Sequence, residues 1–334
     1  VGFGTQAAFL DFDLDGDLDL FQLNHSIHQN GTFGPRKSFL GTTHPLSGDK
    51  FLRNDQGKFV DVTQIVGINS NVVGYGLGVA VSDINLDGYP DLYISNDFHE
   101  NDYLYINQKD GTFKDMLDTM MPHTSRFSMG VDIGDLNNDL YPEIMTLDML
   151  PNDYQTLKRS DGEDAFGIYN YKLGYGYNHQ YSRNCLQLNN GDNTFSDIGF
   201  YSGVAATDWS WSTLFTDFDS DGKKDIFISN GIAKRMNDLD YMNFILNEAA
   251  QEKIKNKKFD DLNLELSKLL PEEKFYNVFY HQDTLLKFRD LQISIENNKK
   301  SFSNGAVYAD LDNDGDEDVV TNNINDFAFL YENK

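Results

Sequence analysis

The chain has little cysteine, few basic residues and no long apolar run, and each shortage excludes a class of protein. Its single cysteine, Cys185, rules out an internal disulfide, so a secreted form needs another stabiliser. The 27 Lys and Arg face 53 Asp and Glu, and the formal net charge of −26 repels nucleic-acid phosphate and anionic lipid. No stretch approaches the roughly 20 apolar residues of a membrane helix. We therefore expect no nucleic-acid partner and no membrane span within these residues.

Length and composition are those of a globular chain. The 334 residues suffice for one large domain or two ordinary ones, and 40% hydrophobic residues can form a sizeable core. Cys185 lies in an alternating run, residues 185–189, which predicts a strand and a small strand side chain rather than a reactive thiol. The chain starts at Val1 without an initiator Met or a signal sequence, so we expect a mature or truncated part of a longer protein.

A nine-residue acidic pattern occurs five times. Its second residue is always apolar, and its first, third, fifth and ninth residues always carry a side-chain oxygen. One such motif is a moderate signal, but recurrence in register is the signature of a repeat architecture. The copies cover residues 11–19, 83–91, 135–143, 217–225 and 310–318.

The spacing of these oxygens suits Ca²⁺. Calcium takes six to eight oxygens at about 2.3–2.6 Å, so a short loop must turn alternate side chains toward one point. Glycine at position 6 permits the bend, the carbonyl of position 7 can add a ligand, and the acid at position 9 closes the shell. Converging carboxylates repel one another unless a cation neutralises them or they protonate. The pattern therefore predicts four to five Ca²⁺ ions.

The predicted ligands are the side chains at positions 1, 3, 5 and 9 of each loop and the backbone carbonyl at position 7. The third loop departs from the pattern, with Leu140 in place of glycine and Glu143 at the closing position. The alternative for each loop is an acidic turn that binds nothing. In chain order the predicted ligands are Asp11, Asp13, Asp15, Asp17, Asp19; Asp83, Asn85, Asp87, Tyr89, Asp91; Asp135, Asn137, Asp139, Tyr141, Glu143; Asp217, Asp219, Asp221, Lys223, Asp225; and Asp310, Asp312, Asp314, Asp316, Asp318.

The residues around each loop predict strands. A short β-like run precedes each loop and another follows it, and a hairpin with Asn, Gly and Asp in its turn comes next. Repeat four has a weaker hairpin, over 285–288 and 291–293. Each repeat is thus expected to form four antiparallel strands, and the fold class is all-β, a β-propeller. The repeats lie near 4–63, 76–118, 128–200, 210–296 and 303–334.

Three insertions interrupt the repeats. Residues 25–48 and the Tyr/Gly-rich residues 149–182 are predicted to be long loops. In residues 231–282, apolar residues at helical spacing predict two helices, over 239–249 and 262–270, packed on the propeller. Tyrosine gives a large contact area at low entropic cost, so the second insertion has the composition of a recognition surface, with a solvated loop as the alternative.

The five loops with their hairpins resemble FG-GAP/VCBS repeats, the calcium-binding propeller blades also found in integrin α-subunit heads. The connecting segments resemble a bacterial subfamily of extracytoplasmic VCBS proteins, similar to cartilage acidic protein, which are often lipoproteins and usually carry a C-terminal ASPIC/UnbV domain. The resemblance implies about seven blades, with about two before Val1 and the further domain after Lys334. The segments that carry it are residues 96–103, 175–181, 207–211 and 237–241.

Weak calcium sites suggest where the protein works. Extracellular modules bind calcium at about 10⁻⁴–10⁻³ M and would be empty in the cytosol, so we expect an extracytoplasmic location, at the cell surface or outer membrane or in the periplasm. Lipid anchoring through a segment outside these residues is left open. The resemblance implies no established reaction.

We expect a non-catalytic module that binds or scaffolds another protein, conceivably in an outer-membrane nutrient-uptake complex. The chain has no nucleophile elbow, phosphate loop or HExxH motif, so we do not expect an enzyme. The alternative is a carbohydrate-binding or carbohydrate-active propeller of the lyase type, with a glycan as ligand. His99 with Glu100 and Asp102 is the candidate catalytic cluster, and a hydrogen-bonded loop is the competing interpretation.

Overall fold

The structure is a computed structural model and describes residues 2–26, 34–247 and 266–334. Five antiparallel sheets follow one another along the chain, four with four strands and the last with three among the described residues. Blade 1 comprises β1 (Gly4–Leu10), β2 (Asp19–Asn24), β3 (Lys50–Asp55) and β4 (Lys58–Asp61), and blade 2 comprises β5 (Gly76–Ser82), β6 (Asp91–Asn96), β7 (Tyr103–Asn107) and β8 (Phe113–Asp115). Blade 3 comprises β10 (Val131–Gly134), β11 (Glu143–Thr146), β13 (Cys185–Asn189) and β14 (Phe195–Asp197), and blade 4 comprises β15 (Ser210–Thr216), β16 (Asp225–Asn230), β17 (Val278–Thr284) and β18 (Lys287–Asp290). Blade 5 comprises β19 (Ser303–Ala309), β20 (Asp318–Asn323) and β21 (Phe329–Tyr331).

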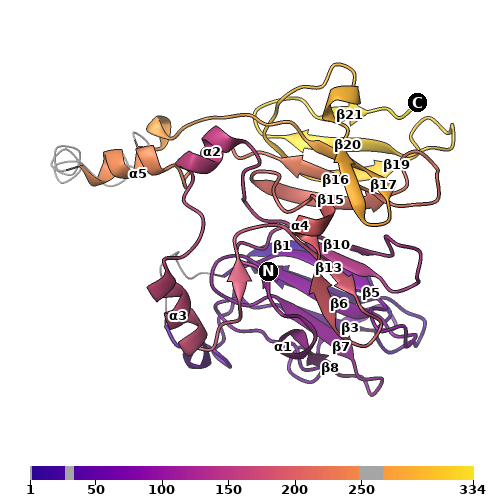
Figure 1. The fold of residues 1–334 in the computed structure, drawn as a ribbon. Helices are drawn as coiled ribbons and strands as arrows, with labels where there is room; N and C mark the ends of the chain where they lie inside the picture. Colours follow the sequence, from indigo (N-terminus) through magenta and orange to yellow (C-terminus); the bar gives the residue numbers. More distant parts are fainter. Residues whose placement is uncertain (1, 27–33, 248–265) are drawn as a thin grey trace.

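The blades are packed through their first strands. β1 contacts β5, β5 contacts β10, β10 contacts β15 and β15 contacts β19, so the sheets succeed one another in chain order (Figure 1). The predicted all-β propeller is confirmed, and each sheet lies inside its predicted repeat. Cys185 is buried at the start of β13, as predicted.

Apolar residues at position 2 of the nine-residue acidic pattern pack between blades. Phe12, at position 2 of the first loop, is buried against Phe51 of β3 and Phe113 of β8, with ring centroids 4.8 and 6.0 Å away. Ile84 and Leu136 are buried at the same position of the next two loops. Burial of such a side chain contributes about 1.5–3 kcal/mol, which explains the apolar residue at position 2 of these three loops. At the same position of the last two loops, Phe218 is only partly buried and Leu311 is 52% exposed.

The prediction of a loop over 149–182 is wrong, because this insertion contains helices α2 (Tyr154–Arg159) and α3 (Phe166–Gly174). Asp153 caps α2 by accepting a bond from the Thr156 amide at 2.8 Å. Residues 180–181 form β12 (Gln180–Tyr181), which pairs in parallel with β9 (Thr124–Ser125). The sequence pattern missed these elements because they are short and bury few residues, so no apolar periodicity marks them.

In the third insertion, the first predicted helix is confirmed as α5 (Leu239–Leu246). It buries none of its residues and lies beside α2, away from the sheets, so the prediction that it packs on the propeller is wrong (Figure 1). A backbone bridge between Ser160 and Asp238 holds its start beside α2. Residues 262–265 of the second predicted helix, 262–270, lie outside the described residues, and residues 266–269 are helical.

Two further predictions concern loops. The first insertion, 25–48, is largely irregular where it is described, with one short turn, η1 (Arg36–Ser38). The predicted strands at 285–288 and 291–293 are wrong, because the blade 4 hairpin turns at Leu285 and Leu286. Leu286 takes a positive φ of 56° and buries its side chain, which the apolar pattern could not distinguish from a strand residue.

The remaining helical turns are short: α1 (Leu117–Met120), α4 (Gly199–Ser202) and η2 (Gln292–Ser294). Among the described residues, the structure contains no helix with the length and apolarity needed to cross a membrane.

Candidate calcium loops and candidate binding surface

The five acidic loops all connect the first and second strands of a blade. In each, the closing acid at position 9 is the first residue of the second strand and is no more than 3% exposed. The strand therefore fixes one carboxylate while the loop brings the others toward it. The closing acids are Asp19, Asp91, Glu143, Asp225 and Asp318.

All five loops share one backbone conformation. The residue at position 4 has a φ between 56° and 64° in every loop, and the residue at position 6 has a φ between 80° and 100°. Leu140 adopts this left-handed conformation as the four glycines do, although a side chain is strained there. The departure of the third loop from the pattern thus leaves its shape unchanged.

Relieving this strain is expected to stabilise blade 3. We expect Leu140→Gly to raise the free energy of unfolding by about 0.5–1 kcal/mol, because the left-handed penalty exceeds the extra chain entropy of glycine. The Leu140 side chain is 74% exposed, so little packing is lost. Urea unfolding in EDTA measures the change. The matched control, Gly88→Leu in the second loop, should lose stability, and destabilisation by Leu140→Gly would contradict the argument.

Hydrogen bonds inside each loop direct its oxygens. In the second loop the Asp83 carboxylate accepts bonds from the amides of Asp87 and Gly88, both at 2.8 Å. The Asp87 carboxylate in turn accepts a bond from the Tyr89 amide at 3.0 Å. Equivalent bonds order the other loops. In three of them the side chains at positions 1, 3 and 5 each place one oxygen within 4.8 Å of the others: Asp11, Asp13 and Asp15; Asp217, Asp219 and Asp221; Asp310, Asp312 and Asp314.

The closing acids are poorly stabilised as anions. Burial, with the charges of Asp87 and Asp83 nearby, raises the pKa of Asp91 to about 7. Burial, with the charges of Asp139 and Asp135, likewise raises the pKa of Glu143 to about 8. A bound cation would favour the charged carboxylates that these surroundings disfavour.

Two loops offer an oxygen that the sequence did not assign. Position 7 is Asp17 in the first loop and Asp316 in the fifth, and one carboxylate oxygen of each is buried without a hydrogen-bond partner. An unsatisfied buried oxygen of this kind is accounted for by a cation ligand. The all-oxygen donor set therefore fits Ca²⁺, held by the side chains at positions 1, 3, 5 and 9.

The fourth loop has different neighbours. His281, on β17, has Nδ1 3.5 Å from an oxygen of Asp219 and 3.4 Å from one of Asp225. Lys223 forms an ion pair with Asp221 in the same loop. Sequence reasoning missed His281, because it is 56 positions beyond Asp225 and only the pairing of β16 with β17 brings them together.

The candidate catalytic residues serve separate interactions. Glu100 is buried and accepts bonds from Arg36 at 3.0 and 2.8 Å and from the Tyr103 hydroxyl at 2.8 Å. Asp102 is buried and accepts bonds from the Tyr93 hydroxyl at 2.6 Å, and also from Ser128 and the Asn96 amide. Burial lowers the pKa of His99 to about 4. These bonds fit the hydrogen-bonded loop interpretation.

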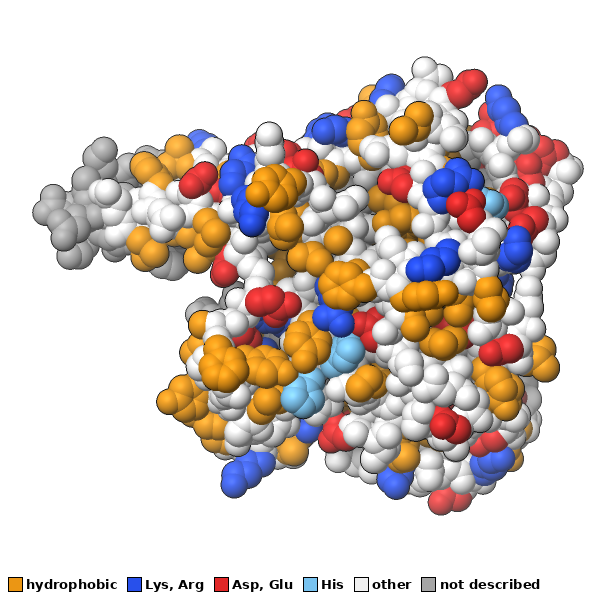
Figure 2. All heavy atoms as spheres, in the orientation of Figure 1, with side chains coloured by type: hydrophobic (Ala, Val, Ile, Leu, Met, Phe, Trp, Pro, Cys, Tyr) orange, Lys and Arg blue, Asp and Glu red, His pale blue; other side chains and the backbone are white. Residues whose placement is uncertain are grey.

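Four aromatic residues and one arginine form a group between α3 and blade 4, which we call the aromatic surface: Tyr169, Tyr181, Arg183, Phe200 and Tyr201. The Tyr169 and Tyr181 rings stack with centroids 6.2 Å apart. The Arg183 guanidinium lies 5.0 Å from the Tyr181 ring and 4.9 Å from the Phe200 ring. Phe200 is 69% and Tyr201 59% exposed. Hydrophobic and basic side chains gather on the face shown in Figure 2.

Basic groups border the aromatic surface. His123 and Arg183 both bond to Asp197, at 2.9 and 2.7 Å, which holds Arg183 in place between the rings. Lys287 of β18 lies over the ring of Tyr201, 3.4 Å from its centroid. His179 bonds the Tyr169 hydroxyl at 2.6 Å. The rings are thereby fixed before any partner binds.

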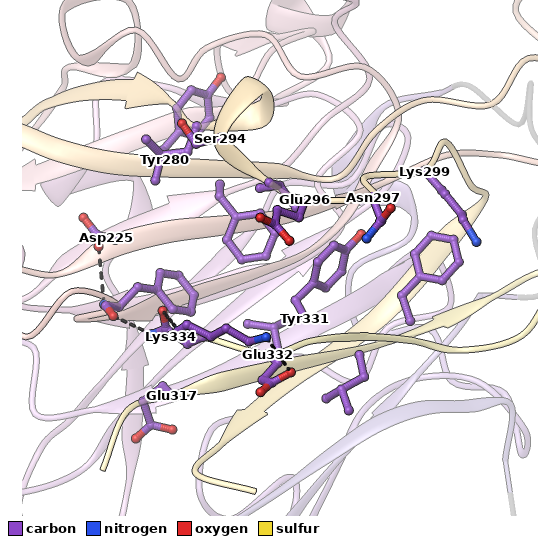
Figure 3. A pocket seen from close by; sticks show the side chains of 18 residues that line it. Asp225, Tyr280, Ser294, Glu296, Asn297, Lys299, Glu317, Tyr331, Glu332 and Lys334 are labelled. Atoms are coloured by element: carbon purple, nitrogen blue, oxygen red, sulfur yellow. Dashed lines mark hydrogen bonds and ion pairs between the residues drawn. The ribbon is translucent and has the colours of Figure 1, made fainter. Parts of the chain in front are cut away.

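A cavity of about 650 Å³ lies between blades 4 and 5 (Figure 3). Phe279 and Tyr331 form part of its wall, with ring centroids 5.0 Å apart. The cavity is also lined by the closing acid Asp225 and by Glu332 and Lys334. Lys334 Nζ lies 3.5 Å from Glu332 Oε2. The cavity thus reaches the fourth loop.

Part of the chain matches a known repeat family. Residues 83–146 match the family model of the FG-GAP-like repeat. The match runs from the second acidic loop through the third and ends with β11. No curated protein matches the chain.

Two solved structures are similar to this chain at low sequence identity. One is described as an Agrocybe aegerita lectin that recognises non-reducing terminal N-acetylglucosamine; the identity is 13%, the TM-score 0.42, and the match covers 99% of this chain and 67% of the lectin chain. The other is the exotype rhamnogalacturonan lyase YesX, with 12% identity, a TM-score of 0.40, and coverage of 99% of this chain and 46% of the lyase chain.

Proposed function

We propose that the protein is a calcium-stabilised, extracytoplasmic β-propeller of the ASPIC/UnbV-associated FG-GAP subfamily that binds another protein as a non-catalytic scaffold. The aromatic surface is the observation that carries the binding role. Tyrosine, phenylalanine and arginine are enriched in protein interfaces. Here Phe200 and Tyr201 are exposed, and the partly buried Arg183, Tyr169 and Tyr181 lie beside them.

The proposed calcium binding supports an extracytoplasmic location. The loops supply oxygen ligands from residues close in sequence, as weak extracellular calcium modules do. Such sites fill at millimolar calcium outside the cytoplasm. They also supply the stabilisation that a chain with one cysteine cannot take from disulfides.

The chemistry of the partner follows from the charge around the aromatic surface. The cations there are Lys287 and Arg183, the latter paired with Asp197, on a chain whose formal net charge is −26. A protein surface with apolar and acidic side chains complements this combination. By the family resemblance, a component of an outer-membrane nutrient-uptake complex is one such partner.

Pull-down from native membranes, followed by calorimetry with the purified partner, tests this role. The chain should recover one stoichiometric partner in calcium, and Phe200→Ala with Tyr201→Ala should weaken that binding at least tenfold, because exposed aromatic anchors dominate interface energy. Phe327→Ala is the matched control, since Phe327 is exposed at 89% on blade 5. Equal binding by the aromatic variant and the wild type would contradict this site.

A glycan is the second candidate ligand, because exposed rings such as Phe200 and Tyr201 can also stack on the apolar faces of sugars. A glycan screen with and without calcium separates the possibilities. Saturable binding without product would favour a carbohydrate-binding module, and turnover would favour a lyase-type enzyme over the scaffold.

A further inference from the structure

One amide side chain in each of blades 2, 3 and 4 bonds the acidic loops of two blades at once. Asn107, the last residue of β7, donates from Nδ2 to the Phe12 carbonyl at 2.8 Å, in the loop of blade 1. It also donates to the Pro90 carbonyl at 3.4 Å, in the loop of its own blade. The same pair of bonds recurs at Asn189, with the carbonyls of Ile84 (3.1 Å) and Pro142 (3.5 Å), and at Gln282, with those of Leu136 and Lys224 (both 2.9 Å).

The backbone of the amide residue continues the connection. The Asn107 amide N–H donates to Oδ1 of the closing acid Asp91 at 2.8 Å. Oδ2 of Asp91 accepts a bond from the Ile84 amide at 2.9 Å, and the Ile84 carbonyl is the acceptor for Asn189 of blade 3. A hydrogen-bond path therefore runs from the loop of blade 1 through the closing acid of blade 2 to blade 3.

The path also reaches blade 5. The closing acid Asp225 accepts bonds from the amides of Gln282 at 2.8 Å and Phe218 at 3.3 Å. Asn333 donates its side chain to the Phe218 carbonyl at 2.5 Å and its amide N–H to the closing acid Asp318 at 3.0 Å. Of these residues, Phe218, Asp225 and Asn333 line the cavity between blades 4 and 5, and Figure 3 shows Asp225 on its wall.

The three bridging amides are shielded from water. The side chains of Asn107, Asn189 and Gln282 are buried, as is Ile84, whose carbonyl is one of the acceptors. Buried hydrogen bonds of this kind resist distortion, because a carbonyl left without a donor cannot turn to solvent. A shift of one closing acid is thus transmitted to the loop of the preceding blade.

We propose that these amides couple the calcium loops of neighbouring blades, so that calcium in one loop strengthens calcium binding in the next. The closing acid is both a predicted calcium ligand and the acceptor at the centre of the path, and calcium would hold it in position. The coupling is reciprocal, as any linkage between two binding sites must be. This inference rests on the proposed calcium binding.

Disabling one loop tests the coupling. Asp87→Asn removes a position-5 carboxylate from the second loop, and calcium binding by the remaining loops is measured by calorimetry with bound ions counted by mass spectrometry. We expect the affinity of the remaining loops to fall about 2- to 10-fold, the range that corresponds to one hydrogen bond. In a chain that also carries Asn107→Leu and Asn189→Leu, Asp87→Asn should cause no further fall.

The control is Asn190→Leu. Asn190 follows Asn189, but its side chain bonds only within the exposed hairpin turn, to Thr194 and Ser196. Asn190→Leu should therefore leave the effect of Asp87→Asn on the affinity of the other loops unchanged. Unchanged affinity of the other loops in Asp87→Asn alone would overturn the coupling, even if the leucine variants do not fold. A wild-type chain that binds no calcium would overturn both proposals, whereas calcium bound at independent sites would overturn only the coupling.

Discussion

Calcium removal should lower the melting temperature of the chain by about 4–13 °C, comparing about 2 mM calcium with EDTA. With dissociation constants of about 10⁻⁴–10⁻³ M, each site contributes about 0.6–1.8 kcal/mol by mass action, and five sites together about 3–9 kcal/mol. The physical source is the group of carboxylates that each loop holds together, including the closing acids that burial disfavours as anions. Thermal unfolding followed by circular dichroism measures the shift, and mass spectrometry counts the ions.

Magnesium at the same concentration is the matched control. Mg²⁺ demands near-ideal octahedral geometry at about 2.0–2.1 Å and gives up its water reluctantly, so it should stabilise much less than Ca²⁺. An equal melting temperature in calcium and EDTA, with no bound metal, would show that the acidic loops are turns only. The extracytoplasmic proposal would then lose its main physical support.

Replacement of Arg235 by Ala should destabilise the chain by about 3–5 kcal/mol, because it leaves a buried charge without its partner. Arg235 and Asp208 are at most 2% exposed, with Arg235 Nη1 2.8 Å from Asp208 Oδ1. Burial raises the pKa of Asp208, and Arg235 opposes that rise. The Arg235 amide N–H also donates to the Pro271 carbonyl, a bond between two parts of the third insertion. Urea unfolding in calcium measures the loss.

The exposed pair of Arg289 and Asp283 is the control, because it has a similar separation of 2.7 Å with side chains 55% and 41% exposed. Arg289→Ala should cost far less than Arg235→Ala, because water screens the exposed pair. Adding Asp208→Asn to Arg235→Ala should recover part of the loss by removing the unpaired charge, and asparagine tolerates the φ of 86° at this position. Similar losses for Arg235→Ala and Arg289→Ala would show that burial of the first pair has no special effect.

The acidic loops and the blades were predictable from sequence because their interactions are local or periodic. Nine consecutive residues supply the predicted ligands of each loop, and the hairpins pair residues that are close in the chain. The spacing therefore predicted the positions of the loops between first and second strands and the limits of the five repeats. The same reasoning erred at Leu286, which is apolar but lies in the turn of its hairpin, and in residues 149–182, whose short helices bury too few residues to show an apolar periodicity.

The sequence by itself thus determined the all-β repeat and its five acidic loops, whose calcium occupancy remains a prediction. Only the tertiary structure decided which residues from different blades meet. Asn107 and Phe12 are 95 positions apart, and no periodic pattern relates them until blades 1 and 2 pack together. The aromatic surface likewise combines residues of the second insertion with Phe200 and Tyr201. Long-range packing creates these contacts, because side chains far apart in the chain become neighbours only when the sheets are assembled.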